Sequence, residues 1–379
     1  MPNYSGIWNI SSQANAKAAG TWPLPPEPHL FSWGNNFYGS LGIGNTTYYS
    51  SPKQVGTLST WLSTACGNYN TVAVKTDGTL WTWGYNAYGQ LGLGNTTNYS
   101  SPKQVGALTS WASVTANAQS ALAVKSNGTL WAWGGNAQGQ LGLGNTTNYS
   151  SPQQVGALTD WSKVAGNTNF NIALKTNGTI WGWGTNTQGQ LGLGNTTNYS
   201  SPKQIGSLTT WLKVASGTYS SYAIKSDGTL WDWGSGFAGA LGLNNETYYS
   251  SPKQVGALTT WNSITGSSFS GYAIKNDGTL WSWGRNTFGK LGLGNSTDYS
   301  SPKQVGSLTT WTRISASRNS TLGIASSQLY AWGGNTQGQL GLGNTTAYSS
   351  PKQVGSLTTW SNVFFDGNTS ITFGIAITA

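Results

Sequence analysis

The chain has 379 residues, of which only 7% are charged, while 53 are Gly and 21 are Trp. Its formal net charge of +9 comes from few acids as much as from many bases. No basic run concentrates that charge, so a nucleic-acid partner is disfavoured. The single cysteine, Cys66, excludes an intramolecular disulfide. No apolar stretch approaches the roughly 18 residues of a membrane-spanning helix, and the first residues lack the basic and apolar regions of a conventional secretory signal.

Residues 1–28 differ from the rest of the chain and are predicted to form an N-terminal arm. Ser11 or Ser12 caps a short helix over residues 13–19, Gly20 ends it, and the proline-rich residues 23–26 form a stiff lead into the next domain. The arm either anchors the protein to a partner or folds back over the main domain, and the sequence leaves both open. The candidate anchor residues are Tyr4, Ile7, Trp8 and Trp22.

Residues 29–379 consist of seven copies of one 50-residue unit, and each copy contains a Trp-Gly pair followed by a version of GQLGLGNTTNYSSPKQVG. Strand-rich repeats of this length bury their apolar faces by stacking on their neighbours, and the closed arrangement is a propeller. We therefore predict an all-β fold, a single seven-bladed β-propeller. The Trp-Gly pair that marks each unit recurs at Trp33, Trp83, Trp133, Trp183, Trp233, Trp283 and Trp332.

The unit at residues 57–106 shows how one blade is built. Residues 71–75 read as a buried strand, and Asp77-Gly78 then predicts a tight hairpin into a strand over residues 80–83. Trp81 and Trp83 share one face of that strand because side chains alternate with period two. We expect both in the core, although Trp residues could also stack on sugars. A Gly-rich loop leads to a short edge strand that contains Pro102, giving three or four strands per unit.

The two ends of the repeat region complement each other. The first unit lacks the Trp-x-x-Val strand, whereas the last unit stops soon after supplying it at residues 360–363. We therefore predict that residues 360–379 pair with residues 29–56 and close the ring non-covalently, which removes two exposed sheet edges.

The pattern Trp83-Gly84-x-Asn86-x-x-Gly89-Gln90-Leu91-Gly92-Leu93-Gly94, with Ala73-x-Lys75-x-Asp77-Gly78, resembles the repeats of the regulator of chromosome condensation (RCC1) family. The resemblance covers residues 29–379 and implies a seven-bladed propeller. The signature pairs of Kelch and WD40 propellers do not recur. Family members include a nucleotide-exchange factor on chromatin, a secreted enzyme inhibitor and modules of ubiquitin ligases. The exchange site of the family uses acidic residues and histidine, and no residue here matches it, since the only histidine is His29 at the entrance to the first blade.

The first 22 residues carry a second resemblance. Tyr4-Ser5-Gly6-Ile7-Trp8 and Ala19-Gly20-Thr21-Trp22-Pro23 are similar to N-terminal segments of structural proteins of marine bacteriophages. This resemblance implies a virion component, in the tail, fibre or decoration of the particle, with the arm contacting other virion proteins. If the protein is cellular instead, we expect it in the cytoplasm.

Two windows vary among the otherwise constant units. The first comprises residues 68–70, 118–120, 168–170, 218–220, 268–270, 318–320 and 367–369; the second comprises residues 35–38, 85–88, 135–138, 185–188, 235–238, 285–288 and 334–337. Tyr, Asn, Ser, Thr and Phe dominate both, which is typical of a binding surface carried on a rigid scaffold. Unconstrained drift is the alternative.

Each window is predicted to recur at one height around the ring, so that the seven copies form a crown of loops. The crown would contact a host-surface glycan or protein. The candidate binding residues are Asn68, Tyr69, Asn70, Gln119, Asn169, Phe170, Tyr219, Phe269, Arg318, Asn319, Phe37, Tyr38, Tyr85, Tyr88, Phe237, Arg285 and Phe288.

Lysine forms two series, one next to the hairpins and one after each Ser-Pro. They either form a ring of positive charge for acidic ligands or protect exposed strand edges from pairing, and we favour protection. The residues are Lys75, Lys125, Lys175, Lys225 and Lys275 in the first series and Lys53, Lys103, Lys203, Lys253, Lys303 and Lys352 in the second.

No arrangement of residues predicts catalysis, a metal site or a cofactor. The GQLGLG loop lacks the Gly-Lys-Ser/Thr and helix of a phosphate-binding loop. Neither a Cys/His cluster nor a Ser/His/Asp set is available. Our hypothesis is a non-enzymatic phage structural or adhesion module. The alternatives are a cellular scaffold or inhibitor that grips another protein and, behind it, a nucleotide-exchange or chromatin-binding protein.

Overall fold

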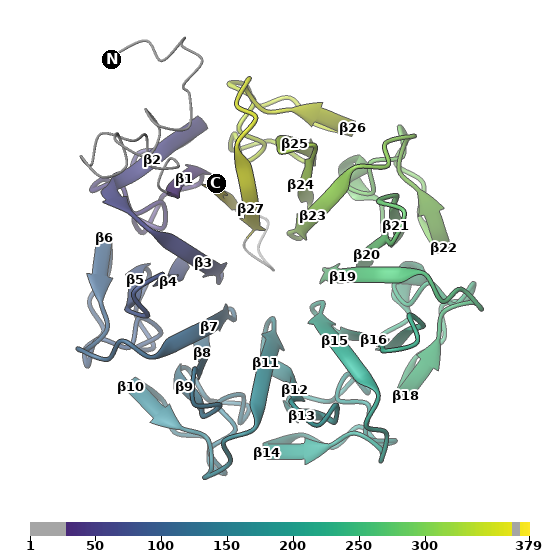
Figure 1. The fold of residues 1–379 in the computed structure, drawn as a ribbon, viewed down its shortest axis with the longest axis horizontal. Coiled ribbons are helices and arrows are strands. Elements are labelled where there is room, and N and C mark those ends of the chain that lie inside the picture. The colour runs from purple at the N-terminus through teal and green to yellow at the C-terminus, as the bar shows by residue number, and fades with distance from the viewer. Residues whose placement is uncertain (1–27, 366–371) are drawn as a thin grey trace, which may run out of the picture.

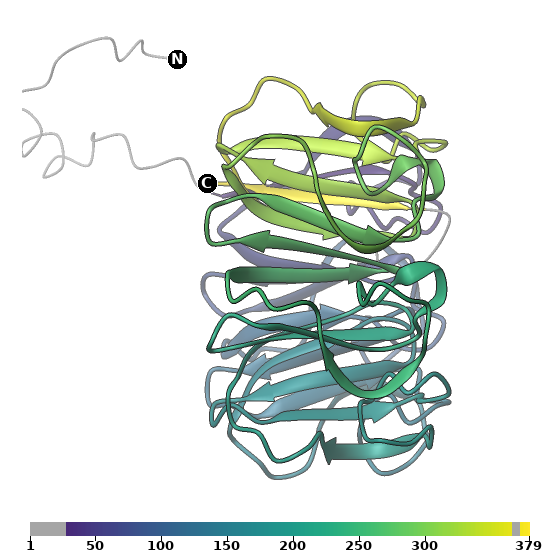
Figure 2. The same cartoon turned by 90° about the vertical axis from the view of Figure 1, so that its right-hand side faces the viewer.

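The computed structural model describes residues 28–365 and 372–379, and these form a closed ring of seven four-stranded antiparallel sheets (Figure 1). Each sheet is one blade, and the ring is a flat disc when seen from the side (Figure 2). The prediction of an all-β, seven-bladed propeller is confirmed, and each blade has four strands. No helix in the described residues is long and apolar enough to cross a membrane.

Strands occupy four positions in a blade, from the centre of the ring outwards. The innermost strands are β3 (Trp61–Cys66), β7 (Trp111–Ala116), β11 (Trp161–Gly166), β15 (Trp211–Ser216), β19 (Trp261–Ser267), β23 (Trp311–Ala316) and β27 (Trp360–Phe365). The second strands are β4 (Asn70–Lys75), β8 (Ser120–Lys125), β12 (Phe170–Lys175), β16 (Ser220–Lys225), β20 (Ser270–Lys275), β24 (Ser320–Ala325) and β28 (Phe373–Thr378).

The third and outermost positions complete each blade. The third strands are β5 (Leu80–Gly84), β9 (Leu130–Gly134), β13 (Ile180–Gly184), β17 (Leu230–Gly234), β21 (Leu280–Gly284), β25 (Gln328–Gly333) and β1 (His29–Gly34). The outermost are β6 (Tyr99–Gln104), β10 (Tyr149–Gln154), β14 (Tyr199–Gln204), β18 (Tyr249–Gln254), β22 (Tyr299–Gln304), β26 (Tyr348–Gln353) and β2 (Tyr49–Ser59). Two 3-10 turns, η1 (Phe237–Gly239) and η2 (Thr287–Gly289), follow β17 and β21.

The hairpin between the second and third strands forms as its sequence predicts. In the blade of β3–β6, the Asp77 carboxylate accepts hydrogen bonds from the backbone nitrogen of Thr79 at 2.9 Å and from its hydroxyl at 2.6 Å. These bonds hold the pKa of Asp77 below its ordinary value. Asn127 and Asn177 accept the equivalent bonds in their blades, so Asp-Gly and Asn-Gly build the same turn.

The ring closes between the two ends of the repeat region, as predicted. One sheet has the order β2-β1-β28-β27, so strands from both ends of the chain share a blade. Within it β1 and β28 pair with Leu30 opposite Ile377 and Trp33 opposite Gly374. This pairing leaves neither end of the ring with a free strand edge.

The core lies between neighbouring blades and is built on tryptophan. Trp83 has no exposed surface, and its ring makes an edge-on contact with that of Trp61 at 5.9 Å. Trp81 lies on the same face and contacts Trp61 at 6.4 Å, but it is only partly buried. The expectation of a core role is therefore confirmed for Trp83, whereas Trp81 lies at the boundary of the core. Its indole nitrogen donates to the Thr79 hydroxyl at 2.8 Å.

The Gly-rich loop fits around the tryptophan of the next blade. Gly92 has φ +71°, and a Cβ at this position would lie 2.8 Å from the Trp133 Nε1. Only glycine combines that backbone conformation with so close an approach. The loop is thus part of the framework that joins one blade to the next.

Candidate functional site

In the part of the chain that the structure describes, both variable windows lie on one face of the disc, which we call the crown. In an antiparallel blade the connections from first to second strand and from third to fourth strand emerge at the same end, and the Asp-Gly hairpin emerges at the other. A backbone hydrogen bond ties the two windows together, as between the Tyr85 nitrogen and the Tyr69 oxygen at 2.9 Å. Equivalent bonds join Gly135 to Gln119, Thr185 to Asn169, Ser235 to Tyr219, Arg285 to Phe269 and Gly334 to Asn319. The windows therefore form one surface.

Two predicted crown residues are buried, and their assignment as contact residues is wrong. Asn70 has no exposed surface and Phe170 is 1% exposed. Each begins the second strand of its blade, opposite Gly84 and Gly184 respectively. The Phe170 ring packs into the hydrophobic cluster between its own blade and the next. The third position of the first window is thus a core position that happens to vary.

Aromatic rings gather where the blade of β1 meets that of β5, in a group that we call the tyrosine cluster: Phe37, Tyr38, Tyr69, Tyr85 and Tyr88. The Tyr38 ring lies 4.5 Å from that of Tyr85 and 5.2 Å from that of Tyr69. Phe37 is 61% exposed and rests edge-on against Tyr38 at 4.7 Å. Partial burial raises the pKa of Tyr85, helped by Tyr88 and Tyr38. The cluster is a rigid contact surface that remains open to solvent.

A second group, the phenylalanine cluster, lies on the blades of β15–β18 and β19–β22 and comprises Tyr219, Phe237, Phe269 and Phe288. Phe269 stacks on Tyr219 at 5.4 Å and meets Phe237 edge-on at 5.0 Å. Phe269 and Phe288 both adopt positive φ, +58° and +62°. Bulky residues rarely adopt this conformation, and such strain concentrates at functional positions.

The other candidate residues are polar and surround these clusters. Asn68, Gln119, Asn169 and Asn319 are partly buried and Arg318 is exposed. The blades between the two clusters thus present amides rather than rings. The crown is therefore an uneven surface with two aromatic clusters, and it is not a ring of equal loops.

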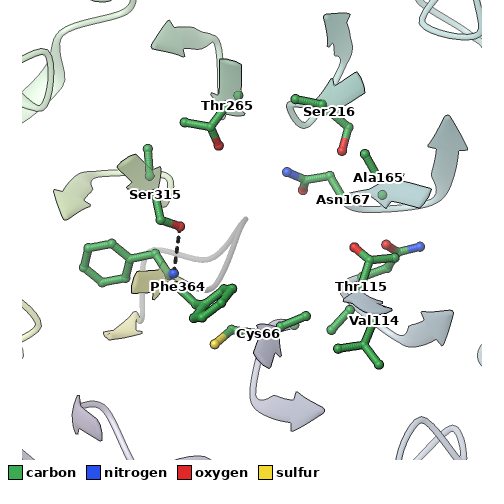
Figure 3. Close-up of a pocket in the computed structure, with 18 of the residues that line it drawn as sticks. Cys66, Val114, Thr115, Ala165, Asn167, Ser216, Thr265, Ser315 and Phe364 are labelled. Atoms are coloured by element: carbon green, nitrogen blue, oxygen red, sulfur yellow. Dashed lines mark hydrogen bonds between the residues drawn. The ribbon is translucent and has the colours of Figure 1, made fainter. Parts of the chain in front are cut away.

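The central channel is a cavity of about 320 Å³ that no sequence pattern predicted (Figure 3). The ends of the inner strands line it with small polar side chains, among them Thr115, Ser216 and Thr265. On one side the Phe365 backbone nitrogen donates to the Ser315 hydroxyl at 3.0 Å. The described residues contain no group of three His, Cys, Asp or Glu side chains able to hold a metal ion. A sequence cue for the channel is the run of small residues that ends six of the seven inner strands, β27 with Phe364 and Phe365 being the exception.

The lysines lie on aromatic rings along the blades, a role that the sequence did not predict. Lys275 lies 3.7 Å from the centre of the Trp281 ring, and Lys103 lies 5.4 Å from that of Tyr99. A cation over an aromatic face is stabilised by the ring quadrupole. Burial lowers the pKa of Lys125 and Lys275. Among the described residues the only ion pair joins Lys175 to Asp160 at 3.1 Å. The contacts tie both lysine series into the blades.

One crown residue was missed. Lys290 replaces the glutamine that four other blades carry in Gly-Gln-Leu-Gly, at Gln90, Gln140, Gln190 and Gln339. Alignment of the copies shows the substitution within a segment that otherwise belongs to the framework.

Some predicted residues lie outside the described part of the chain. These are the anchor residues Tyr4, Ile7, Trp8 and Trp22, the predicted helix over residues 13–19, and the window at residues 367–369. Those assignments stay predictions.

Comparison with known proteins identifies a sequence family and a shared fold. The sequence profile of the RCC1-like domain matches residues 29–375, whereas no curated protein matches the chain in sequence. The structure is similar to Prp20p from Saccharomyces cerevisiae, with a TM-score of 0.81 and 20% identity over 100% of this chain and 96% of that one. It is similar to yeast RCC1 (Prp20) bound to Kap60, with a TM-score of 0.81 and 20% identity over 94% and 90%.

Human WBSCR16 gives a TM-score of 0.80 at 19% identity, over 93% of this chain and 98% of that one. At these identities the structural similarities establish the fold and leave the function open. The sequence profile, in contrast, covers nearly the whole ring. The chain belongs to the RCC1-like domain family.

Proposed function

We propose that this protein is a non-enzymatic binding propeller that holds a macromolecular partner on its crown. The observation that carries this proposal is the exposure of the two aromatic clusters on one face. Phe37 is 61% exposed and Phe288 is 50% exposed. Exposed aromatic rings on a rigid scaffold supply contact area at little cost in conformational entropy, and aromatic residues and arginine dominate binding energy at interfaces.

The uneven pattern of the crown supports binding over drift. Drift would scatter rings among the seven blades, whereas the tyrosine cluster joins Tyr38 of one blade to Tyr69 and Tyr85 of the next. Such contacts require compatible residues in windows that are about 31 and 47 positions apart. Aromatic rings that gather from two neighbouring blades into one exposed patch are typical of an interaction surface.

We further propose that the protein is a virion component, a phage tail, fibre or decoration protein whose crown contacts a host-surface glycan or protein. This finer proposal is supported by the resemblance of residues 1–22 to marine phage structural proteins, and it gives the N-terminal arm the task of holding other virion proteins. The corresponding location is the phage particle.

A cellular protein-binding propeller is the second candidate. It is supported by the likeness to yeast Prp20, a relative whose structure was solved in complex with Kap60. In this function the crown would grip a protein as a scaffold or inhibitor, and the location would be cytoplasmic.

The binding proposal is tested by removing exposed crown rings without touching the core. Phe37→Ser, Phe237→Ser and Phe288→Ser can be combined, and the matched control combines Leu108→Ser, Leu158→Ser and Leu208→Ser. These leucines are 46–50% exposed and follow the outermost strands at the opposite face. Wild-type protein and both variants are applied to a glycan array and to immobilised host surface proteins. Loss of binding in the crown variant alone supports the proposal, and equal loss in both variants contradicts it.

The virion proposal needs its own experiment. Cosedimentation with intact phage particles, abolished by deleting residues 1–22, would support it. A protein that never sediments with particles contradicts the virion role but leaves the crown experiment valid.

A further inference from the structure

Lys290 introduces a buried charge at a point where the repeat has an amide. In the blade of β5 the Gln90 Oε1 accepts a hydrogen bond from the Tyr88 backbone nitrogen at 2.9 Å. This bond satisfies a backbone donor in a loop of the crown. Lys290 is 1% exposed. Its Nζ donates instead to the carbonyl oxygens of Ser268 at 2.7 Å and Arg318 at 2.9 Å. The ammonium group therefore lies beneath the crown and bridges two blades.

A cavity of about 270 Å³ opens above this ammonium group. Its wall includes Lys290, Arg285, Arg318, Phe269, Phe288 and Asn319, and none of the lining residues is acidic. Ligand cavities usually measure about 300–1,000 Å³, so this one has room for a group the size of a single ring. We call it the basic pocket.

The positive charge of the basic pocket is not balanced by the protein. The Arg285 Nε donates to the Thr287 hydroxyl at 2.8 Å, and neither arginine belongs to the only ion pair in the described part of the chain. The one carboxylate that acts on Lys290 is that of Asp298. Asp298 is exposed, and its Oδ1 accepts the Asn286 backbone N–H at 2.6 Å.

The charged form of Lys290 is destabilised because its ammonium group is buried and lies near two other positive charges. Desolvation is the main cause that lowers the pKa of Lys290 to about 7; Arg285 and Arg318 also lower it, and Asp298 opposes them. An anion in the pocket would offset the mutual repulsion of three cationic groups. Phe269 and Phe288, both with positive φ, line this pocket, and such backbone strain concentrates at functional positions.

We propose that the basic pocket binds the carboxylate of an acidic sugar unit in a surface polysaccharide. This inference rests on the proposed binding function of the crown. The guanidinium groups of Arg285 and Arg318 suit a carboxylate because their planar donors match its two oxygens. The phenyl rings would cover the apolar face of the sugar ring, and the Asn319 amide can bond its hydroxyls.

The surroundings of the pocket favour a sugar polymer over an acidic protein side chain. An aspartate or glutamate would use the arginines but would leave a ring-sized space between two phenyl groups. A polysaccharide would also extend across the windows of the neighbouring blade, where Tyr219 and Phe237 are exposed. The net charge of +9 would attract a polyanion to the propeller.

The proposal is tested by calorimetric titration of the full chain with methyl β-D-glucuronide and with its neutral match, methyl β-D-glucoside. The glucuronide is expected to bind at least ten times more tightly than the glucoside. Arg318→Gln and Lys290→Gln should each weaken glucuronide binding at least tenfold. Lys290→Gln restores the residue found in four other blades and should remain folded. Lys253→Gln, an exposed change on the outermost strand β18, is the control and should change nothing.

A pH series separates charge from structure. As pH falls from 8.5 to 6, Lys290 gains its proton while the glucuronide carboxylate and both arginines keep their charge. Binding should therefore tighten as the pH falls, and Lys290→Gln should lose this dependence. If Lys290 had only a structural role, glucuronide binding would depend on pH in Lys290→Gln as it does in the wild type.

Three results would overturn the proposal: no binding of the glucuronide, equal binding of sulfate, or tighter binding of the tripeptide Gly-Glu-Gly. The last would assign the pocket to an acidic protein. If the glucuronide fails to bind while the crown variant with Phe37→Ser still loses its partner, this inference is wrong and the proposed function stands.

Discussion

The indole nitrogen of Trp33 donates a 2.8 Å hydrogen bond to the carbonyl oxygen of Gln339, across 306 positions of the chain. The same bond joins each blade to the one before it, as from Trp183 to Gln140 at 3.0 Å and from Trp332 to Lys290 at 2.8 Å. The contact that closes the ring is therefore the contact that builds it. The junction between the last repeat and the first therefore uses the same contact as the other junctions, because Trp33 bonds to the Gly-Gln-Leu-Gly loop of the last repeat.

Removal of residues 360–379 should unfold the whole ring. The truncation takes away β27 and β28, and it exposes β1 together with the apolar surface that Trp360 covers. Because each blade is stabilised mainly by its neighbours, we expect one cooperative transition at a much lower melting temperature by calorimetry. Trp33→Phe is the control, since it keeps the strands and loses only one hydrogen bond and part of one buried ring, a cost of about 2–3 kcal/mol. An unchanged melting temperature in the truncated protein would contradict ring closure.

Trp83 and Trp81 should differ in their contributions to stability. Trp83→Ala removes a fully enclosed side chain and should lower the free energy of unfolding by about 3–5 kcal/mol. Trp81 is only partly buried and its site can be refilled by solvent, so Trp81→Ala should cost less, about 2 kcal/mol. Denaturant titration measures both values. A larger cost at Trp81 than at Trp83 would contradict the placement of Trp83 in the core and of Trp81 at its boundary.

Two glycines separate backbone strain from steric exclusion. Both have positive φ, but a Cβ at Gly92 would meet the Trp133 indole at 2.8 Å, whereas a Cβ at Gly106 would meet nothing within 4 Å. Gly106→Ala should cost about 1 kcal/mol from the left-handed conformation alone. Gly92→Ala adds overpacking and should cost about 3 kcal/mol in total. Equal costs in denaturant titration would mean that the loop is free to move away from the indole.

Asp232 should make stability depend on pH. It has no exposed surface, neither carboxylate oxygen has a hydrogen-bond partner, and burial raises its pKa well above the ordinary value. The folded protein therefore holds a proton that the unfolded chain releases above about pH 4. Stability contributed by this group is full below that pH and is lost as the pH rises towards the raised pKa.

Asp232→Ser tests this dependence. Serine occupies the same position in two other blades, where Ser32 and Ser282 donate to the carbonyl oxygens of Leu41 and Leu291. The variant should be more stable than the wild type, and the gain should grow between pH 4 and pH 8 in thermal melts. Asp227→Asn is the matched control, because Asn127 accepts the same hairpin bond in another blade. A gain that is constant across the pH range would contradict a raised pKa.

The framework was predictable because its signals are local. Short stretches of sequence and their repetition predict three features. These are the hairpin at Asp77-Gly78, the alternation that places Trp83 inside, and the missing strand that residues 360–365 supply. The errors concern burial. Asn70 and Phe170 vary among the repeats, yet both are buried at the start of a second strand, and variation alone does not distinguish a loop residue from a buried strand residue.

The sequence by itself determined a closed, seven-bladed ring, since period, strand alternation and turn residues are properties of neighbouring positions. Only the tertiary structure decided which variable residues meet. Tyr38 reaches Tyr69 and Tyr85, and Lys290 bridges to the Arg318 carbonyl, because blade packing brings together residues 28 to 47 positions apart. These encounters depend on the shape of the whole ring, and the surface on which binding is proposed is made of them.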